Sequence, residues 1–152
     1  MSINVTAGQP ILIVEDSDDD FEATFRAFQH TNNLSNPLYR CESGSEAMDF
    51  LLQQGKYSAP GAAPRPGLIL LDLNMPGMDG RKVLSKVKST SELQTIPVVV
   101  LTTSDHEDDI QECYHLGANS YIKKPVELDD FFMAIERLKE YWFEVSVLPK
   151  GS

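Results

Sequence analysis

The sequence contains no continuous run of about 18 apolar residues, and this excludes a transmembrane helix of ordinary length. Its first residues lack the basic start and the apolar segment of a secretory signal peptide. The two cysteines, Cys41 and Cys113, have neither the spacing of a metal-binding motif nor the number needed for a disulfide framework. We therefore expect a cytoplasmic protein that does not contact membranes and whose thiols are inert.

Basic residues are also scarce, because 13 lysines and arginines stand against 23 aspartates and glutamates, which gives a formal net charge of -10. Binding to nucleic acid normally requires a basic patch, and no local run of lysine and arginine provides one. Nucleic acid is therefore excluded as a partner. The acidic balance favours cations or basic protein surfaces instead.

The chain has enough apolar material for one core, since 41% of its 152 residues are hydrophobic. We expect a single domain over residues 9–148, with a flexible N-terminus at residues 1–8 and a C-terminal tail at residues 149–152. The segment 55–67 holds several prolines and glycines, and it is predicted to be a long surface loop.

Short continuous apolar runs alternate with amphipathic segments along the chain. Continuous runs are typical of strands that are buried on both faces of a parallel sheet. The expected strands are 11–14, 37–42, 68–71, 98–102 and 120–123. The expected helices are 18–30, 45–54, 81–89, 107–116 and a last one that runs from 128 past 141. This alternation predicts an α/β fold with a doubly wound parallel sheet that carries helices on both faces.

Asp72 stands directly after the third apolar run, in the stretch LILLDLNMPGMDG (68–80). In an open parallel sheet, ligands bind outside the carboxyl ends of the strands, so Asp72 is expected at the edge where such folds do their chemistry. Taken alone, Asp72 could equally cap a turn, because the turn residues Pro76 and Gly77 follow it closely. The other strand ends are needed to decide between these interpretations.

Polar side chains follow the other strands too. The residues expected at this edge are Glu15, Asp16, Asp72, Thr102 and Lys124. Neighbouring carboxylates resist ionising beside one another, and a divalent cation removes that strain. A site whose ligands are all oxygen atoms, and which leaves coordination positions open for water, suits Mg²⁺.

Each of these residues has an ordinary explanation when taken alone. Lys124 could be a surface lysine and Thr102 a strand residue, while Glu15 and Asp16 could solvate the start of the next helix. Ser17 and Asp20, just beyond, have the spacing of a helix capping box. The joint placement of five such residues after four different strands favours a common site.

The motifs that carry these five positions are ILIVED (11–16), LLDLNMPGMDG (70–80), VVLTTS (99–104) and YIKKP (121–125). Together, and in this order, they resemble the receiver domain of bacterial two-component response regulators. The resemblance covers about residues 9–139. It implies a CheY-like, flavodoxin-like sheet of five parallel strands in the order 2-1-3-4-5.

The resemblance implies a phosphoacceptor signalling protein rather than an enzyme with a separate substrate. Asp72 would accept a phosphoryl group from a histidine of a sensor histidine kinase, and the protein would assist its own phosphorylation and dephosphorylation. Glu15, Asp16, Asp72 and the backbone carbonyl of Asn74 would hold Mg²⁺. Asn74 and Ser104 would also tune the rate of dephosphorylation.

A conformational switch is implied as well. Thr102 and Lys124 would bind the phosphoryl group, and Tyr121 would turn inward into the space that Thr102 leaves. The face made of the fourth helix, the fifth strand and the fifth helix would repack and bind a protein partner. The bond between Lys124 and Pro125 would be cis.

The C-terminal part of the chain is more apolar than one core contact requires. We expect a homodimer whose interface contains Phe131, Phe132, Ile135, Leu138, Tyr141 and Trp142. Alternatively, the tail folds back on its own chain, and the alternation over 143–147 is compatible with a short extra strand. The long loop 55–67 and the tail YWFEVSVLP (141–149) resemble stand-alone response regulators that are paired with cyanobacterial phytochromes. The kinase would then be a light sensor.

Three other functions are weighed against this interpretation. A degenerate receiver could act as an unphosphorylated adaptor, but all five positions are intact. A phosphatase that forms a phospho-aspartate would need an aspartate where Asn74 stands. A flavodoxin-like carrier of FMN would need a glycine- and hydroxyl-rich loop after the first strand, and the acidic stretch 15–20 would repel its phosphate.

Overall fold

The centre of the molecule is a five-stranded parallel sheet. The computed structural model describes residues 9–30, 36–75, 79–103, 105–125 and 127–140. The strands are β1 (Ile11–Val14), β2 (Leu38–Cys41), β3 (Leu68–Asp72), β4 (Val98–Thr102) and β5 (Ser120–Lys123). They lie in the order β2-β1-β3-β4-β5, and each neighbouring pair is parallel. The predicted fold class and strand order are therefore confirmed.

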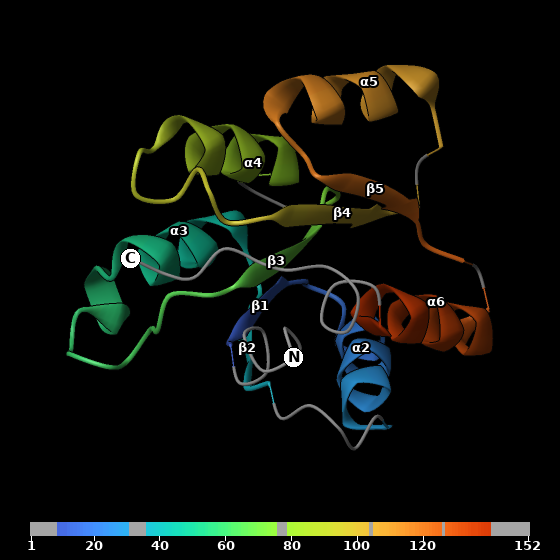
Figure 1. The fold of residues 1–152 in the computed structure, drawn as a ribbon, viewed down its shortest axis with the longest axis horizontal. Helices are drawn as coiled ribbons and strands as arrows, with labels where there is room; N and C mark the ends of the chain where they lie inside the picture. Colours follow the sequence, from blue (N-terminus) through green and yellow to red (C-terminus); the bar gives the residue numbers. More distant parts are fainter. Residues whose placement is uncertain (1–8, 31–35, 76–78, 104, 126, 141–152) are drawn as a thin grey trace.

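Helices cover both faces of this sheet (Figure 1). They are α2 (Asp18–His30), α3 (Gly44–Leu52), α4 (Gly80–Ser89), α5 (Glu107–Leu116) and α6 (Leu128–Glu140). Ile11 and Ile13 of β1 face the layer of α2 and α6, while Leu12 and Val14 face the layer of α3, α4 and α5. The three central strands, β1, β3 and β4, are therefore buried on both sides, as their continuous apolar runs predict, whereas the edge strands β2 and β5 are only partly buried.

The segment 55–67, which was predicted to be a long surface loop, begins with a short 3-10 helix, η1 (Gly55–Tyr57). The ring of Tyr57 packs edge-on against Phe50, with 5.1 Å between the ring centroids, and its hydroxyl donates a hydrogen bond to Glu46 at 2.6 Å. These contacts with α3 give the start of the segment a fixed conformation, which its glycine and proline content did not indicate.

The apolar stripe of α6 is buried by the chain itself. Phe131, Ile135 and Leu138 are 2%, 1% and 8% exposed, and they pack with α2 and the sheet. The prediction that these three residues form a dimer interface is therefore wrong, because their spacing serves the monomer core. Phe132 is half-buried against the same core. Tyr141, Trp142 and the strand considered at 143–147 lie outside the described residues, as do residues 1–8 and 149–152.

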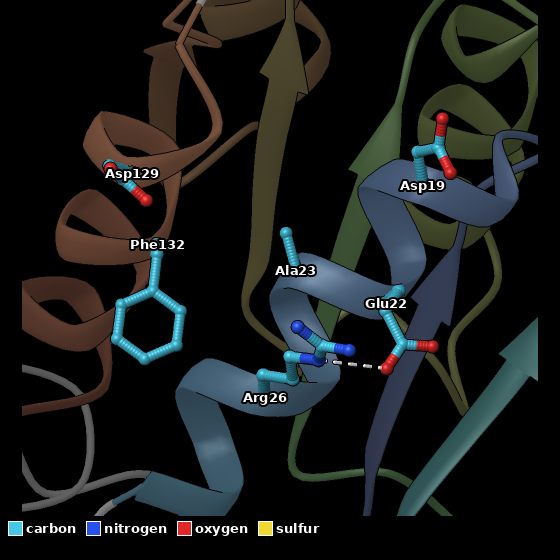
Figure 2. Close-up of a pocket in the computed structure, with 6 residues that line it drawn as sticks. All are labelled: Asp19, Glu22, Ala23, Arg26, Asp129 and Phe132. Carbon is cyan, nitrogen blue, oxygen red and sulfur yellow. Dashed lines mark hydrogen bonds and ion pairs between the residues drawn. The ribbon is translucent and has the colours of Figure 1, made fainter.

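A groove of about 240 Å³ separates the exposed flanks of α2 and α6 (Figure 2). It is lined by Asp19, Glu22, Ala23, Arg26, Asp129 and Phe132. Arg26 donates a hydrogen bond along α2 to Glu22 at 3.0 Å. None of the residues expected at the acidic edge of the sheet lines this groove. Among the described residues, no helix has both the length and the apolar character needed to cross a membrane.

Candidate functional site

Three acids meet at the carboxyl ends of β1 and β3. Glu15 and Asp16 follow β1, Asp72 ends β3, and the two strands are paired in register through Val14 and Leu71. One carboxylate oxygen from each acid lies within 4.8 Å of the others. Glu15 and Asp72 are buried, at 4% and 6% exposure, whereas Asp16 is exposed. The structure thus brings together the three carboxylates that the sequence places at this edge.

The backbone of Asp72 is held by the start of α4. Asp79 caps this helix by accepting a hydrogen bond from the Arg81 amide at 2.7 Å. The next residue, Gly80, donates its own amide to the Leu73 carbonyl at 3.1 Å. A Cβ at Gly80 would stand only 2.4 Å from the Asp72 carbonyl oxygen. Only glycine permits this approach of helix to strand end, so Gly80 fixes where Asp72 stands.

Replacing Gly80 with alanine is expected to destabilise the protein by about 2 kcal/mol, because the methyl group meets backbone atoms that cannot rotate away. Helix propensity alone would favour alanine by roughly 0.5–1 kcal/mol, so the two effects differ in sign. Urea unfolding measures the difference, with Ser85→Ala on the exposed side of the same helix as control. A Gly80→Ala protein as stable as the parent would contradict the close approach.

Lys124, which directly follows β5, provides the positive charge of the site. Its Nζ lies 2.7 Å from Glu15 Oε1, 2.8 Å from Asp20 Oδ2 and 3.5 Å from Asp72 Oδ2. The residue is 6% exposed, and its backbone amide donates a hydrogen bond to the Thr102 carbonyl at 2.7 Å. The lysine is therefore a buried member of the acidic cluster.

The crowding shifts the ionisation of this pair. Burial raises the pKa of Glu15 from 4.5 to about 7, although the hydrogen bond and charge of Lys124 oppose this rise. Burial disfavours the charged form of Lys124, but its hydrogen bonds to Asp20 and Glu15, together with the negative charges of Glu15 and Asp72, outweigh this effect, so the pKa of the ammonium lies above its ordinary value. The lysine thus stays charged, while the carboxylates remain under strain that a cation would relieve.

Thr102 and Asn74 form a second, neutral part of the site. Thr102 is fully buried, and its Oγ1 accepts a hydrogen bond from Asn74 Nδ2 at 2.9 Å. The backbone amide of Asn74 donates a second hydrogen bond, to Asp72 Oδ1 at 3.1 Å. The sequence predicted a role for the Asn74 carbonyl, but it gave no signal for this side-chain bond to Thr102.

Tyr121 lies on β5, partly buried against the core layer of α3, α4 and α5. Its backbone amide donates a hydrogen bond to the hydroxyl of Tyr114 on α5 at 3.1 Å. In the register of β4 and β5, Val100 pairs with Tyr121 and Thr102 with Lys123, so Tyr121 lies two positions before the level of Thr102 on the neighbouring strand.

One predicted detail is contradicted, and another lies outside the residues that the structure describes. The bond between Lys124 and Pro125 is trans, since the described residues contain no cis peptide bond. The expectation of a cis bond was wrong, and trans is the form that bonds before proline ordinarily favour, by roughly 0.5–1 kcal/mol. Ser104, expected to tune dephosphorylation, lies outside the described residues.

Asp20 is a neighbour of Lys124 that the sequence did not reveal. Its backbone amide donates a hydrogen bond to Ser17 Oγ at 3.3 Å, as the capping spacing predicts. Its carboxylate, however, is directed to Lys124, 104 residues away in the chain. A third acid in the first turn of a helix has an ordinary explanation in the helix dipole, so no local pattern distinguished it.

The donor set fits a divalent cation. Glu15, Asp16 and Asp72 offer three oxygens at mutual distances that one ion can span, and oxygen ligands are what hard cations such as Mg²⁺ and Mn²⁺ prefer. Exposed Asp16 leaves the site open to solvent, so water or a phosphate oxygen can complete the coordination shell.

Comparison with known proteins agrees with this geometry. The sequence profile described as response regulator receiver domain matches residues 11–136. Response regulator Rcp1 from Synechocystis sp. is 43% identical over 139 residues, which cover 91% of this chain and 92% of Rcp1.

Two solved structures share the fold at similar levels of identity. The crystal structure of the Mn(2+)-bound form of Rcp1 superposes with a TM-score of 0.88 at 42% identity, covering 93% of this chain and 99% of that one. The phosphorylated cyanobacterial phytochrome response regulator RcpA gives a TM-score of 0.89 at 40% identity, covering 95% of this chain and 100% of that one. With its acidic triad, buried lysine and sheet order all in place, the chain belongs to the family of response regulator receiver domains.

Proposed function

We propose that Asp72 is the phosphoacceptor of a stand-alone, cytoplasmic response regulator whose single receiver domain spans residues 9–148. The observation that carries this proposal is the position of its buried carboxylate, within 4.8 Å of two further acids and 3.5 Å from the Lys124 ammonium. An Asp72 oxygen attacks the phosphorus of a phosphohistidine on a sensor histidine kinase. A P–O bond forms, the P–N bond breaks, and its electron pair stays on the imidazole nitrogen.

Positioning and charge stabilisation account for most of the catalysis of such a transfer. The backbone amide of Asn74 holds one oxygen of Asp72 at 3.1 Å, which leaves the other oxygen to attack the phosphorus. The Lys124 ammonium neutralises charge on the moving phosphoryl oxygens, and the Thr102 hydroxyl can donate to one of them. When bound by Glu15, Asp16, Asp72 and the Asn74 carbonyl, Mg²⁺ would supply the additional positive charge. The same groups support attack by water and self-dephosphorylation, which Asn74 and Ser104 would tune.

Magnesium binding is expected to depend on the two acids after β1. Replacing Asp16 with asparagine should weaken Mg²⁺ binding by at least about tenfold, because one of three charged ligands becomes neutral. Isothermal titration of the protein with MgCl₂ measures the affinity. Asp130→Asn on the exposed first turn of α6 removes the same charge elsewhere and serves as control. Equal affinities in the two variants would place the cation somewhere other than the triad.

The partner kinase is proposed to be a phytochrome-type light sensor. Support comes from the similarity to RcpA, which is described as a cyanobacterial phytochrome response regulator, and to Rcp1. The test is a panel of autophosphorylated histidine kinases, mixed with the protein and Mg²⁺, in which label on the protein is followed over seconds to minutes. Fastest transfer from phytochrome-type kinases supports the assignment. Transfer from unrelated kinases alone contradicts the light-sensing partner but leaves Asp72 as acceptor.

The output is proposed to pass through Thr102 to the face formed by α5, β5 and α6. Thr102 is tied to Asn74 at 2.9 Å, and the same strand end lies beside β5, which carries Tyr121. A phosphoryl group adds about 1.5 to 2 negative charges, which gives the Thr102 hydroxyl a stronger partner. Movement of Thr102 then opens space for the Tyr121 ring, and the two packings bind the downstream protein differently. A homodimer also remains part of this proposal, and the mass of the protein in solution tests it.

Replacing Thr102 with alanine should leave phosphorylation by acetyl phosphate largely intact but suppress the change around Tyr121. The measurement is the backbone amide signal of Tyr121 by NMR, before and after acetyl phosphate and Mg²⁺ are added. We expect a clear shift in the parent protein and less than half of it in Thr102→Ala. Thr103→Ala, at an exposed neighbouring position, is the control. A full shift in Thr102→Ala would show that the switch does not run through this hydroxyl.

A further inference from the structure

The ammonium of Lys124 is closer to Asp20 than to the acceptor. Its Nζ lies 2.8 Å from Asp20 Oδ2 but 3.5 Å from Asp72 Oδ2. Asp20 belongs to the first turn of α2, and its carboxylate is not among those that could share a cation with Glu15, Asp16 and Asp72. The structure therefore contains a fourth acid in this region, and it is directed at the lysine rather than at the cation site.

The backbone around Asp20 holds this carboxylate in place. The Asp20 amide donates to Ser17 Oγ at 3.3 Å, and its carbonyl accepts a hydrogen bond from the Thr24 hydroxyl at 3.0 Å. Both contacts lie within the first turns of α2, so the side chain projects from a well-defined helix start. An ammonium has three protons to donate. Glu15 at 2.7 Å and Asp20 at 2.8 Å take the two short hydrogen bonds, and Asp72 receives the longer ionic contact.

We propose that Asp20 is a positioning residue that holds Lys124 away from Asp72 and so limits the rate of phosphorylation. This inference rests on the proposed function of Asp72. For the lysine to reach the oxygens of an incoming phosphoryl group, its bond to Asp20 must lengthen or break. The carboxylate left behind remains at the N-terminal end of α2, where the helix dipole favours a negative charge. Phosphorylation therefore exchanges one partner of Lys124 for another, and Asp20 sets the difficulty of that exchange.

Asp20→Asn tests the idea, because asparagine keeps the size of the side chain and removes the ionic contact. The initial rate of phosphorylation by acetyl phosphate and Mg²⁺ should rise on the order of fivefold, as expected for loss of a partly exposed ion pair. Because acetyl phosphate is a small-molecule donor, the measured rate does not depend on docking of a kinase. The matched control is Asp19→Asn, which removes the same charge from the same helical turn, where Asp19 is exposed. Its rate should stay within about twofold of the parent, which separates positioning from general repulsion of the anionic donor.

Rescue by glutamate distinguishes positioning from a disturbed fold. Asp20→Glu restores a carboxylate that can reach Lys124, so its rate should return to within about twofold of the parent, whereas a structural defect would not be repaired. Equal rates in Asp20→Asn and Asp19→Asn overturn the proposal, as does a slower Asp20→Asn protein. If either of these rates is found while the parent is labelled and Asp72→Ala is not, only the role of Asp20 is refuted and Asp72 remains the acceptor. If Asp72→Ala is labelled as well, the proposed acceptor fails and Asp20 fails with it.

Discussion

Replacing Asp72 with alanine is expected to abolish labelling of the protein, both from a phosphorylated histidine kinase and from acetyl phosphate. The neighbouring acids cannot substitute for it, because Asp16 is exposed at the rim and Glu15 already accepts the short bond from Lys124 at 2.7 Å. Glu15 is also buried, but both of its oxygens are engaged, because Oε2 accepts a hydrogen bond from the Ser17 backbone amide at 3.2 Å and Oε1 accepts the bond from Lys124. Asp72 has one oxygen held by the Asn74 backbone amide at 3.1 Å, and its second oxygen lies 3.5 Å from the Lys124 ammonium. Phosphate-affinity electrophoresis measures the phosphorylated fraction over time.

The same change is expected to preserve the fold. Removing Asp72 relieves repulsion among three crowded carboxylates, and Lys124 keeps its two shorter partners. In EDTA, the free energy of unfolding should stay the same or rise by up to about 1 kcal/mol. Asp130→Asn, on the exposed first turn of α6, is the control for the charge itself and should be labelled at the parent rate. Label that persists on Asp72→Ala would contradict the role of Asp72 as acceptor. A marked loss of stability would contradict the repulsion among the three carboxylates.

Replacing Lys124 with alanine should have the largest effect on stability of any change at this site. The pair with Glu15 has side chains that are 7% and 5% exposed, so the alanine variant leaves acids buried beside one another without a positive charge. Removing one partner of a buried pair costs roughly 3 kcal/mol or more. Phosphorylation should also slow on the order of 100-fold, because a positive group facing the transferred phosphoryl is lost.

The neighbouring lysine provides a matched control for this prediction. Lys123 pairs with Asp105 at 3.0 Å, but both side chains are more than half exposed. An exposed pair contributes at most about 1 kcal/mol, so Lys123→Ala should cost far less than Lys124→Ala. Urea unfolding in EDTA compares the two. Similar losses in both variants would contradict the buried position of Lys124.

The loss in Lys124→Ala should depend on pH. The pKa of Glu15 is already raised in the folded parent, from 4.5 to about 7, and without the lysine it rises further. A carboxyl group with a raised folded pKa favours folding below its unfolded pKa, and this contribution is lost as pH rises through the folded pKa. The deficit of Lys124→Ala relative to the parent should therefore be small near pH 5 and largest near pH 8. A deficit that grows toward acid would contradict this origin.

The elements of the fold were predictable because burial on both faces leaves a strong local pattern. The runs ending at Val14, Thr102 and Lys123 have the predicted bounds, and α2 and α5 begin and end where the capping and apolar pattern place them. The start of α3 differs by one residue from the predicted 45, because Ser43 caps it with a bond from the Glu46 amide. Such end effects depend on one hydrogen bond and are not visible in periodicity.

The site was predictable where it rests on backbone placement, and less so where it rests on side-chain direction. Any parallel sheet brings the residues after β1, β3, β4 and β5 to one edge. The choice of Asp20 as a partner of Lys124, and of Thr102 as a partner of Asn74, joins segments far apart in sequence. The stripe of Phe131 and Ile135 was misassigned for a related reason. An apolar helix face must be covered, but its sequence does not say whether its own sheet or a second chain covers it.

The hydrogen bond from the Tyr121 amide to the Tyr114 hydroxyl bears on how the last strand meets other proteins. β5 is the outer strand on its side of the sheet, and an outer strand with free amides invites a foreign strand to pair with it. Here one of the outward amides already has an acceptor from α5, at 3.1 Å. A peptide strand from another protein could not pair with β5 at this point without displacing the Tyr114 hydroxyl. Recognition at this edge is therefore expected to proceed through side-chain packing on helices rather than through strand addition, and the exposed edge is shielded from uncontrolled self-association.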